Sequence, residues 1–253
     1  MFSRGCIRCC LFPHRHLPQR RLGHGLRPGG GPPSGCDPLP GCRAGFLPGG
    51  PGGLWRAGLR GRVFAGALER LSPLRGQGTP CIVTVTYGNR DFDDALLELT
   101  DFCRERGFVP LAGAALVGEH TYGSIQVGRP TAEDLEQDRA FALEAWDDWN
   151  AGWEGFSPPG NRPYREGGKG GSFVPSTLEN CTRCGLCRDQ CPMGAIGEDC
   201  TSIDSSRCIS CFRCVKRCPV KAKGCFTPEY ESFAQAFSQR LKEPRENQYF
   251  LPR

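Results

Sequence analysis

The sequence predicts an α/β domain with a parallel sheet, a small α+β module after it, and low-complexity sequence in front of both. Three observations lead to this fold class. Strand and helix patterns alternate in residues 61–150, cysteines recur at fixed spacing in residues 176–226, and glycine and proline runs interrupt residues 1–60. Residues 151–175 predict a linker, and residues 227–253 predict a C-terminal helix and tail.

Residues 1–60 predict a disordered segment, because glycine and proline runs at 29–33 and 47–53 stop any regular element from propagating. The segment has nine Arg, no Lys and one acid, Asp37, so the rest of the chain is net negative although the whole carries +5. The Arg residues are not interleaved with aromatic ones, which argues against nucleic-acid binding. This bias is also typical of coding sequence read out of frame, and a frame change near Arg60 is our hypothesis for it.

The chain has 17 cysteines, which in a short secreted protein would predict disulfides. No apolar stretch at the N-terminus is long enough for a signal peptide, and none elsewhere is long enough to span a membrane. We therefore predict a cytoplasmic protein in which reduced thiols bind metal. The cysteines and histidines of residues 6–42 match no usual zinc-ligand spacing.

Hydrophobic periodicity predicts the elements of the α/β part. The strands and helices alternate, which implies a right-handed parallel arrangement, although two strands are only half of a doubly wound sheet. The predicted elements are a helix at 63–71, a strand at 81–87, a helix after Asp91, a strand at 108–117 and a helix at 131–149.

Several contacts are predicted for the later helices and the linker. In the helix at 131–149, the residues predicted to face inward are Leu135, Ala142, Trp146 and Trp149. In the linker, the aromatic residues predicted to contact a domain surface are Trp153, Phe156 and Tyr164. Apolar residues at helical spacing predict the C-terminal helix at 228–242.

The cysteines of residues 181–219 form an internal repeat with a period of 27 residues. Each copy reads Cys-x2-Cys-x2-Cys-x3-Cys-Pro and begins at Cys181 or Cys208. Three cysteines at this spacing can bind three corners of a [4Fe-4S] cluster from one loop, and the fourth turns to the other cluster. The pattern therefore predicts two clusters, the first held by Cys181, Cys184, Cys187 and Cys218, and the second by Cys191, Cys208, Cys211 and Cys214.

Two such clusters predict one-electron transfer by a ferredoxin-type carrier or redox subunit. The alternative is a scaffold with two four-cysteine zinc sites, in which a three-cysteine run followed by Cys-Pro is rare. Cys200 and Cys225 lie outside the repeat and are not expected to be ligands. Between Cys181 and Cys225 eight basic residues outnumber four acids. Two interpretations stay open, a surface that attracts a redox protein with an acidic surface as donor or acceptor and a solvated surface that offsets the charge of the clusters.

Several segments outside the cysteine repeat carry a family resemblance. Residues 85–90 read Val-Thr-Tyr-Gly-Asn-Arg, and residues 118–120 read Gly-Glu-His. Further matching segments lie at 93–99, 128–130, 159–164 and 243–246. With these segments and the cysteine repeat, residues 61–253 resemble a family of prokaryotic two-domain electron carriers in which a flavodoxin-like domain precedes a two-cluster ferredoxin.

The resemblance implies that residues 81–149 are the last two βα units of a flavodoxin-like sheet. It also implies that Tyr87, Gly88, Asn89 and Arg90 form the loop beside the flavin ring of FMN. Ligands of open parallel sheets bind at the carboxyl ends of strands, where this loop falls, although Gly-Asn is also ordinary turn sequence. The Ser/Thr-Gly-Thr phosphate loop of that family is missing here. Two functions therefore stay open, a carrier with clusters alone and an FMN-dependent reductase fed by its own ferredoxin module.

Overall fold

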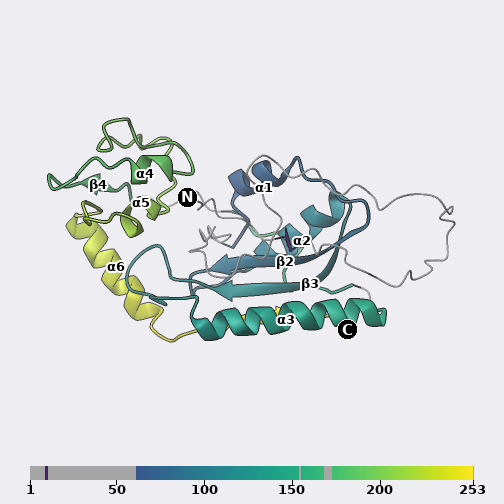
Figure 1. The fold of residues 1–253 in the computed structure, drawn as a ribbon. Coiled ribbons are helices and arrows are strands. Elements are labelled where there is room, and N and C mark those ends of the chain that lie inside the picture. Colours follow the sequence, from purple (N-terminus) through teal and green to yellow (C-terminus); the bar gives the residue numbers. More distant parts are fainter. Residues whose placement is uncertain (1–8, 11–60, 154, 168–172, 253) are drawn as a thin grey trace.

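The computed structural model describes residues 9–10, 61–153, 155–167 and 173–252. Almost all of the segment predicted to be disordered lies outside the described residues. Within them, the chain forms an α/β layer around a four-stranded sheet, with a cysteine-rich module at one end of it (Figure 1). The predicted α/β class is confirmed in this coarse form, whereas the flavodoxin fold stays a prediction. No helix in the described part is both long and apolar enough to cross a membrane.

The centre of the sheet is a parallel pair of strands, β2 (Thr79–Tyr87) and β3 (Phe108–Val117). β2 begins two residues before the predicted strand, and β3 has the predicted bounds. The helix α2 (Ala95–Glu105) connects them, after a turn that contains the predicted Asp91. The carboxyl ends of both strands point toward the cysteine-rich module (Figure 1).

Two short strands that were not predicted pair antiparallel with the edges of this central pair. β1 (Cys9–Cys10) lies beside β2 and β6 (Gln248–Phe250) lies beside β3, which gives the strand order β1-β2-β3-β6. β1 is a two-residue exception within the segment that is predicted to be disordered. The reason is physical, since the open edge of a strand presents N–H and C=O groups that pair with any extended segment nearby.

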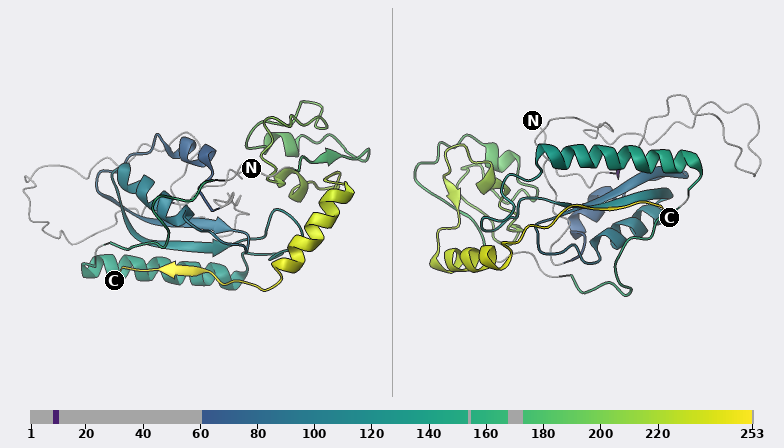
Figure 2. Two further views of the ribbon diagram at one scale, coloured as in Figure 1. Left: turned by 180° about the vertical axis from the view of Figure 1, so that it is seen from behind. Right: turned by 90° about the horizontal axis from the view of Figure 1, so that it is seen from below.

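Helices cover both faces of the sheet (Figure 2). α1 (Ala65–Leu71) and α2 pack on one face, where Val83 and Leu99 are in the core. α3 (Ala132–Ala151) packs on the other face, against Ile82 and neighbouring residues. Ile82 and Val83 reach opposite cores because successive side chains of a strand point to opposite faces.

The buried side of α3 agrees with the predicted one except at Leu135. Leu135 is 43% exposed, whereas Phe141 and Ala145 are buried. The reason is β6, because the ring of its Tyr249 lies 4.9 Å from the ring of Phe141 and fixes which side of the helix faces inward. The predicted contacts of Ala142, Trp146 and Trp149 with the core are confirmed.

The linker predicted at 151–175 folds back on α2. Phe156 is buried, and the hydroxyl of Tyr164 donates to a carboxylate oxygen of Asp101 over 2.6 Å. Both predicted contacts are therefore confirmed, whereas Trp153 is 52% exposed, contrary to the prediction.

The module begins after the linker and ends in a long helix. The elements are β4 (Ser176–Thr177), α4 (Leu186–Asp189), α5 (Arg213–Lys216), β5 (Lys223–Gly224) and α6 (Pro228–Arg240). β4 and β5 pair antiparallel. α6 begins at the predicted residue and ends two residues earlier than predicted. Its Tyr230 and Phe233 contact Tyr122, which lies in the loop after β3.

The folded-back linker depends on one carboxylate, that of Asp94, which is 1% exposed. Its Oδ1 accepts the backbone N–H of Asn161 over 2.8 Å, and its Oδ2 accepts the backbone N–H of Arg165 over 2.7 Å. Burial alone would raise the pKa of Asp94, but these N–H donors outweigh it and the pKa is lowered. The unfolded chain therefore binds the proton more readily than the folded chain.

We expect Asp94→Ala to reduce the free energy of unfolding by about 3 kcal/mol, because two donors lose a charged acceptor. In the wild type this stabilisation is present above pH ~4 and is lost as the pH falls through the lowered pKa of the folded state. Urea unfolding followed by tryptophan fluorescence measures both effects. The control Asp147→Ala, at an exposed site on α3, should change the stability by less than about 0.5 kcal/mol. Equal effects of the two variants would contradict this role of Asp94.

Candidate metal centre

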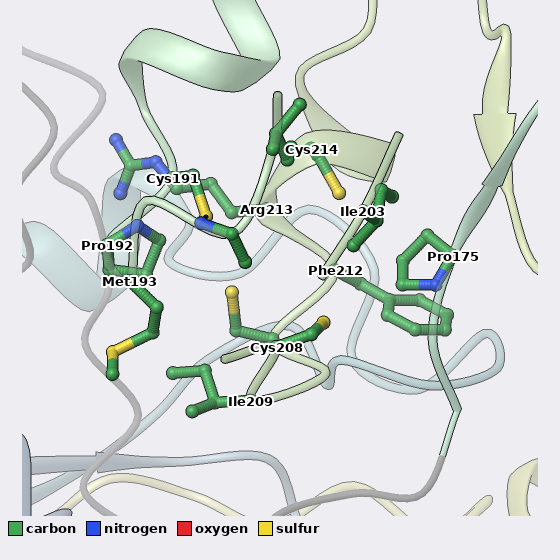
Figure 3. Close-up of a pocket in the computed structure, with 13 residues that line it drawn as sticks. Pro175, Cys191, Pro192, Met193, Ile203, Cys208, Ile209, Phe212, Arg213 and Cys214 are labelled. Carbon is green, nitrogen blue, oxygen red and sulfur yellow. Dashed lines mark hydrogen bonds between the residues drawn. The ribbon is translucent and has the colours of Figure 1, made fainter. Parts of the chain in front are cut away.

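The module contains two hollows, and four cysteines of the repeat line each of them. The first hollow is lined by Cys181, Cys184, Cys187 and Cys218, and the second hollow by Cys191, Cys208, Cys211 and Cys214. Each hollow draws three cysteines from one copy of the repeat and one from the other copy. In Figure 3 the sulfur atoms of the labelled cysteines face the second hollow from different sides. The structure thus brings together the same two groups that the repeat pairs in the sequence.

The repeat is also a repeat of backbone conformation. Arg183 and Ser210, which are equivalent positions, are left-handed with φ of 53° and 51°. Gly185 and Phe212, also equivalent, have φ of 80° and 52°, and α4 and α5 begin directly after them. Left-handed residues reverse the chain over a short distance. They turn successive cysteines of each run toward the same hollow.

Backbone N–H groups point at four of the cysteine sulfurs, again in equivalent pairs. The N–H groups of Arg183 and Ser210 each lie 3.4 Å from the sulfurs of Cys181 and Cys208, respectively. The N–H of Ala195 lies 3.3 Å from the sulfur of Cys191, and that of Ala222 lies 3.2 Å from the sulfur of Cys218. Donors in this position stabilise the negative charge of a thiolate. Hydrogen bonds to sulfur are one of the factors that set the potential of an iron–sulfur cluster.

The protein environment acts differently on individual thiols. Burial raises the pKa of Cys214 to about 12, and the neighbouring Cys211 acts in the same direction, while the ammonium group of Lys223 opposes both. Burial also acts to raise the pKa of Cys218, but a set of backbone N–H groups outweighs it and the pKa is lowered. Because metal ligands must be deprotonated, the bound metal has to supply more of the stabilising charge at Cys214 than at Cys218.

The residues present fit an iron–sulfur cluster. Both hollows are open to solvent, and each is lined by four cysteines of the repeat. Four thiols around such a space match the all-cysteine ligand set of a cubane cluster. Within the described residues, no three His, Cys, Asp or Glu side chains are close enough together to hold a single metal ion.

A buried cation beside the second hollow also fits an anionic group. Arg213 lines this hollow, and its Nε and one Nη are buried without a hydrogen-bond partner in the described part of the chain. A buried donor without an acceptor is costly. A cluster with thiolate ligands is negatively charged and would supply the missing acceptors.

Cys200 also lines the first hollow, but its sulfur interacts elsewhere. The residue is buried, and its thiol lies 3.9 Å from the carbonyl oxygen of Arg183 and 3.7 Å from that of Glu198. Cys187, a predicted ligand of the same hollow, has a similar contact with the carbonyl oxygen of Cys200 over 3.9 Å. These contacts therefore do not separate ligands from other cysteines, and the expectation that Cys200 is not a ligand stays a prediction.

The predicted flavin loop lies at the carboxyl end of β2, and its residues contact other parts of the chain. Tyr87 and Asn89 are each 2% exposed. The side-chain amide of Asn89 donates to the carbonyl oxygens of Leu241 and Glu243 over 2.9 and 2.8 Å. Its oxygen accepts the backbone N–H of Arg245 over 2.8 Å. The tail after α6 thus holds this loop.

The other two loop residues also lie against other side chains of the chain. Arg90 forms an ion pair with Asp93, and a side chain added at Gly88 would meet the ring of His120. FMN binding by these four residues stays a prediction.

Comparison with known families identifies the module. Residues 174–219 match the family model of the 4Fe-4S dicluster domain, and this range contains all eight cysteines of the repeat. The match supports a ferredoxin-type domain with iron–sulfur clusters and a role in iron–sulfur electron transfer. No curated protein and no solved structure matched the chain.

Because Cys200 lies outside the repeat, whose eight cysteines already complete two groups of four, we expect Cys200→Ala to keep the full iron and sulfide content of the wild type. The cost should be limited to the lost packing of one sulfur atom, about 1 kcal/mol. Iron and sulfide analysis after anaerobic purification measures this. A loss of about four iron atoms per chain, one cluster's worth, would show that Cys200 is a ligand.

Proposed function

We propose that this chain transfers electrons through two [4Fe-4S] clusters, as a ferredoxin-type carrier or a redox subunit. One observation carries the proposal, the division of the eight repeat cysteines between two hollows with an exchange of the fourth cysteine. The first cluster would be held by Cys181, Cys184, Cys187 and Cys218, and the second by Cys191, Cys208, Cys211 and Cys214. When bound, each cluster can accept and release one electron.

The residues around the hollows are suited to hold such a group and to leave it accessible. Backbone N–H groups donate to sulfur atoms in both hollows, which stabilises the charge of the thiolates. Cys184 in the first hollow and Cys211 in the second are exposed. Each cluster would therefore have one ligand at the protein surface, where a redox partner can approach.

The proposed partner is a redox protein with an acidic surface. The exposed basic residues of the module are Arg183, Arg207, Lys216, Arg217 and Lys221. Lys216 is paired with Glu119, and the half-buried Arg188 with Asp189 and Glu198, so part of the positive charge is neutralised within the chain. The remaining positive charge would attract an acidic partner and speed its encounter.

The alternative function, an FMN-dependent reductase fed by this module, needs a flavin site. Its proposed loop at Tyr87–Arg90 is held by the C-terminal tail, and the side chain of Asn89 is already hydrogen-bonded. We therefore favour electron transfer by the clusters alone. The flavin content of the purified protein decides between the two.

We expect anaerobically purified protein to contain about eight iron and about eight sulfide per chain, as two four-iron clusters require. It should contain no flavin, and dithionite should reduce it with the appearance of the electron paramagnetic resonance of reduced clusters. Zinc in place of iron would contradict electron transfer. Stoichiometric FMN would instead favour the reductase.

The ligand assignment can be tested separately. We expect Cys214→Ala to lose at least half of the bound iron, because one cluster lacks a ligand and the two halves of the module share both clusters. The matched control is Cys225→Ala, a half-buried cysteine outside the repeat, which should keep the wild-type content. Equal iron in the two variants would overturn the assignment of Cys214.

A further inference from the structure

The two copies of the repeat differ at two positions that line the hollows. Lys223 lines the first hollow, while its equivalent in the other copy, Ile196, lines the second. Arg213 lines the second hollow, while its equivalent, Leu186, lines the first. Each hollow therefore contains one basic and one aliphatic residue at these two positions. The basic residue of the first hollow is at the position that is aliphatic in the second hollow, and the reverse holds for the other position.

Lys223 is buried to an unusual degree for a lysine, with 3% exposure. Its ammonium group donates to the hydroxyl of Thr177 over 2.6 Å, and this hydroxyl donates to the carbonyl oxygen of Thr201 over 3.1 Å. Lys223 and Thr177 are also opposite each other in the pairing of β5 with β4, which fixes the side chain in place. Within the described residues, no carboxylate lies at ion-pair distance from this ammonium group.

Arg213, which lines the second hollow, is half-buried as a residue, but part of its guanidinium group is buried. Two of its guanidinium nitrogens are buried without a partner in the described part of the chain, and its charged neighbours include Cys191 and Cys211. Figure 3 shows the guanidinium group on the side of the hollow where Cys191 lies. Lysine and arginine are almost never fully buried unless they are paired. Two basic groups buried without carboxylates indicate that another anion is their partner.

The anion that the proposed function supplies is the cluster with its thiolates. A nearby cation stabilises the more negative, reduced form of a cluster more than the oxidised form, and so raises its reduction potential. The effect is large where the cation is buried, because water and salt screen it little. A separate cation in each hollow would allow the two potentials to be set separately.

We propose that Lys223 and Arg213 are the buried counter-cations of the two clusters, and that each raises the reduction potential of the cluster in its own hollow. Lys223 lines the first hollow and acts mainly on its cluster, but its ammonium group also acts on the thiol of Cys214, so a weaker effect on the second cluster is expected. Arg213 acts on the cluster of the second hollow, which it lines. Thr177 is a positioning residue that holds the Lys223 ammonium group. The inference rests on the proposed function, because it needs both clusters to be bound.

The test replaces each cation by the residue type that the other copy carries, in Lys223→Ile and Arg213→Leu. Anaerobic redox titration of the full chain, followed by the paramagnetic resonance of the reduced clusters, gives both potentials. We expect Lys223→Ile to lower mainly one of the two potentials and Arg213→Leu mainly the other. Each main shift should correspond to at least a tenfold change in the equilibrium constant, which is 59 mV for one electron. The double variant should lower both.

The matched control is Lys221→Gln, which removes the same charge from an exposed residue two positions before Lys223. This control should change both reduction potentials by only a small fraction of the shift expected for the two cation variants, because solvent and salt screen a surface charge. The proposal is overturned if neither variant lowers a potential, if both lower mainly the same one, or if the control has an equal effect.

Iron and sulfide content separates this inference from the proposed function. Wild-type protein without the two clusters would refute both, whereas full clusters with unchanged potentials in the variants would refute only the role of the cations. If Lys223→Ile does not retain iron, Thr177→Val decides for the first hollow. This variant keeps the charge but frees the ammonium group, and we expect a smaller shift of the same potential in the same direction. No shift would refute the role of Lys223.

Discussion

The exchange of the fourth cysteine between the two copies of the repeat is the constraint on which the module depends. Neither copy can complete a four-cysteine site alone, since Cys218 completes the first hollow and Cys191 the second. The buried residues of the module are few and mostly small, such as Ala195 and Ala222. A domain of this size rarely has enough hydrophobic core to be stable without a disulfide or a metal. Folding of the module and binding of its clusters are therefore expected to be one event.

The module is joined to the α/β layer by the chain that leaves it. α6 carries an aromatic side against the loop after β3, and the tail then runs past Asn89 and pairs with β3 as β6. The same tail supplies Asn247, whose side chain accepts the backbone N–H of Val117 at the end of β3. The C-terminal segment thus completes the sheet and also fixes the module at the carboxyl ends of its strands.

The sequence predicted those features that local patterns determine. The bounds of β3 follow from continuous apolar sequence, the helix α2 follows from the helical period of its apolar residues, and the two groups of cysteines follow from the repeat. β1, β6 and the contact of Phe141 with Tyr249 could not be predicted, because they depend on which distant segment meets an open strand edge. The role of Lys223 was also not visible from charge alone. It appears only when its position is compared with Ile196 and its burial is known.

The two copies of the repeat differ at Phe212, and the contacts of this residue with the rest of the protein explain the difference. The equivalent residue is Gly185, which adopts a left-handed conformation at little cost, whereas a bulky residue there is strained by about 1–3 kcal/mol. The ring of Phe212 lies 5.1 Å from that of Tyr122 and 5.3 Å from that of Tyr230. Aromatic pairs of this kind contribute roughly 0.5–1.5 kcal/mol each beyond the burial of their area.

These contacts can offset the strain, and they form only in the copy that faces the α/β layer. Pro192, which also lines the second hollow, accepts a hydrogen bond from Arg70 of α1 through its carbonyl oxygen. Two residues of the second hollow therefore contact the α/β layer directly. The second hollow thus lies next to the α/β layer, and the strained phenylalanine is one of the residues that join it to the rest of the protein.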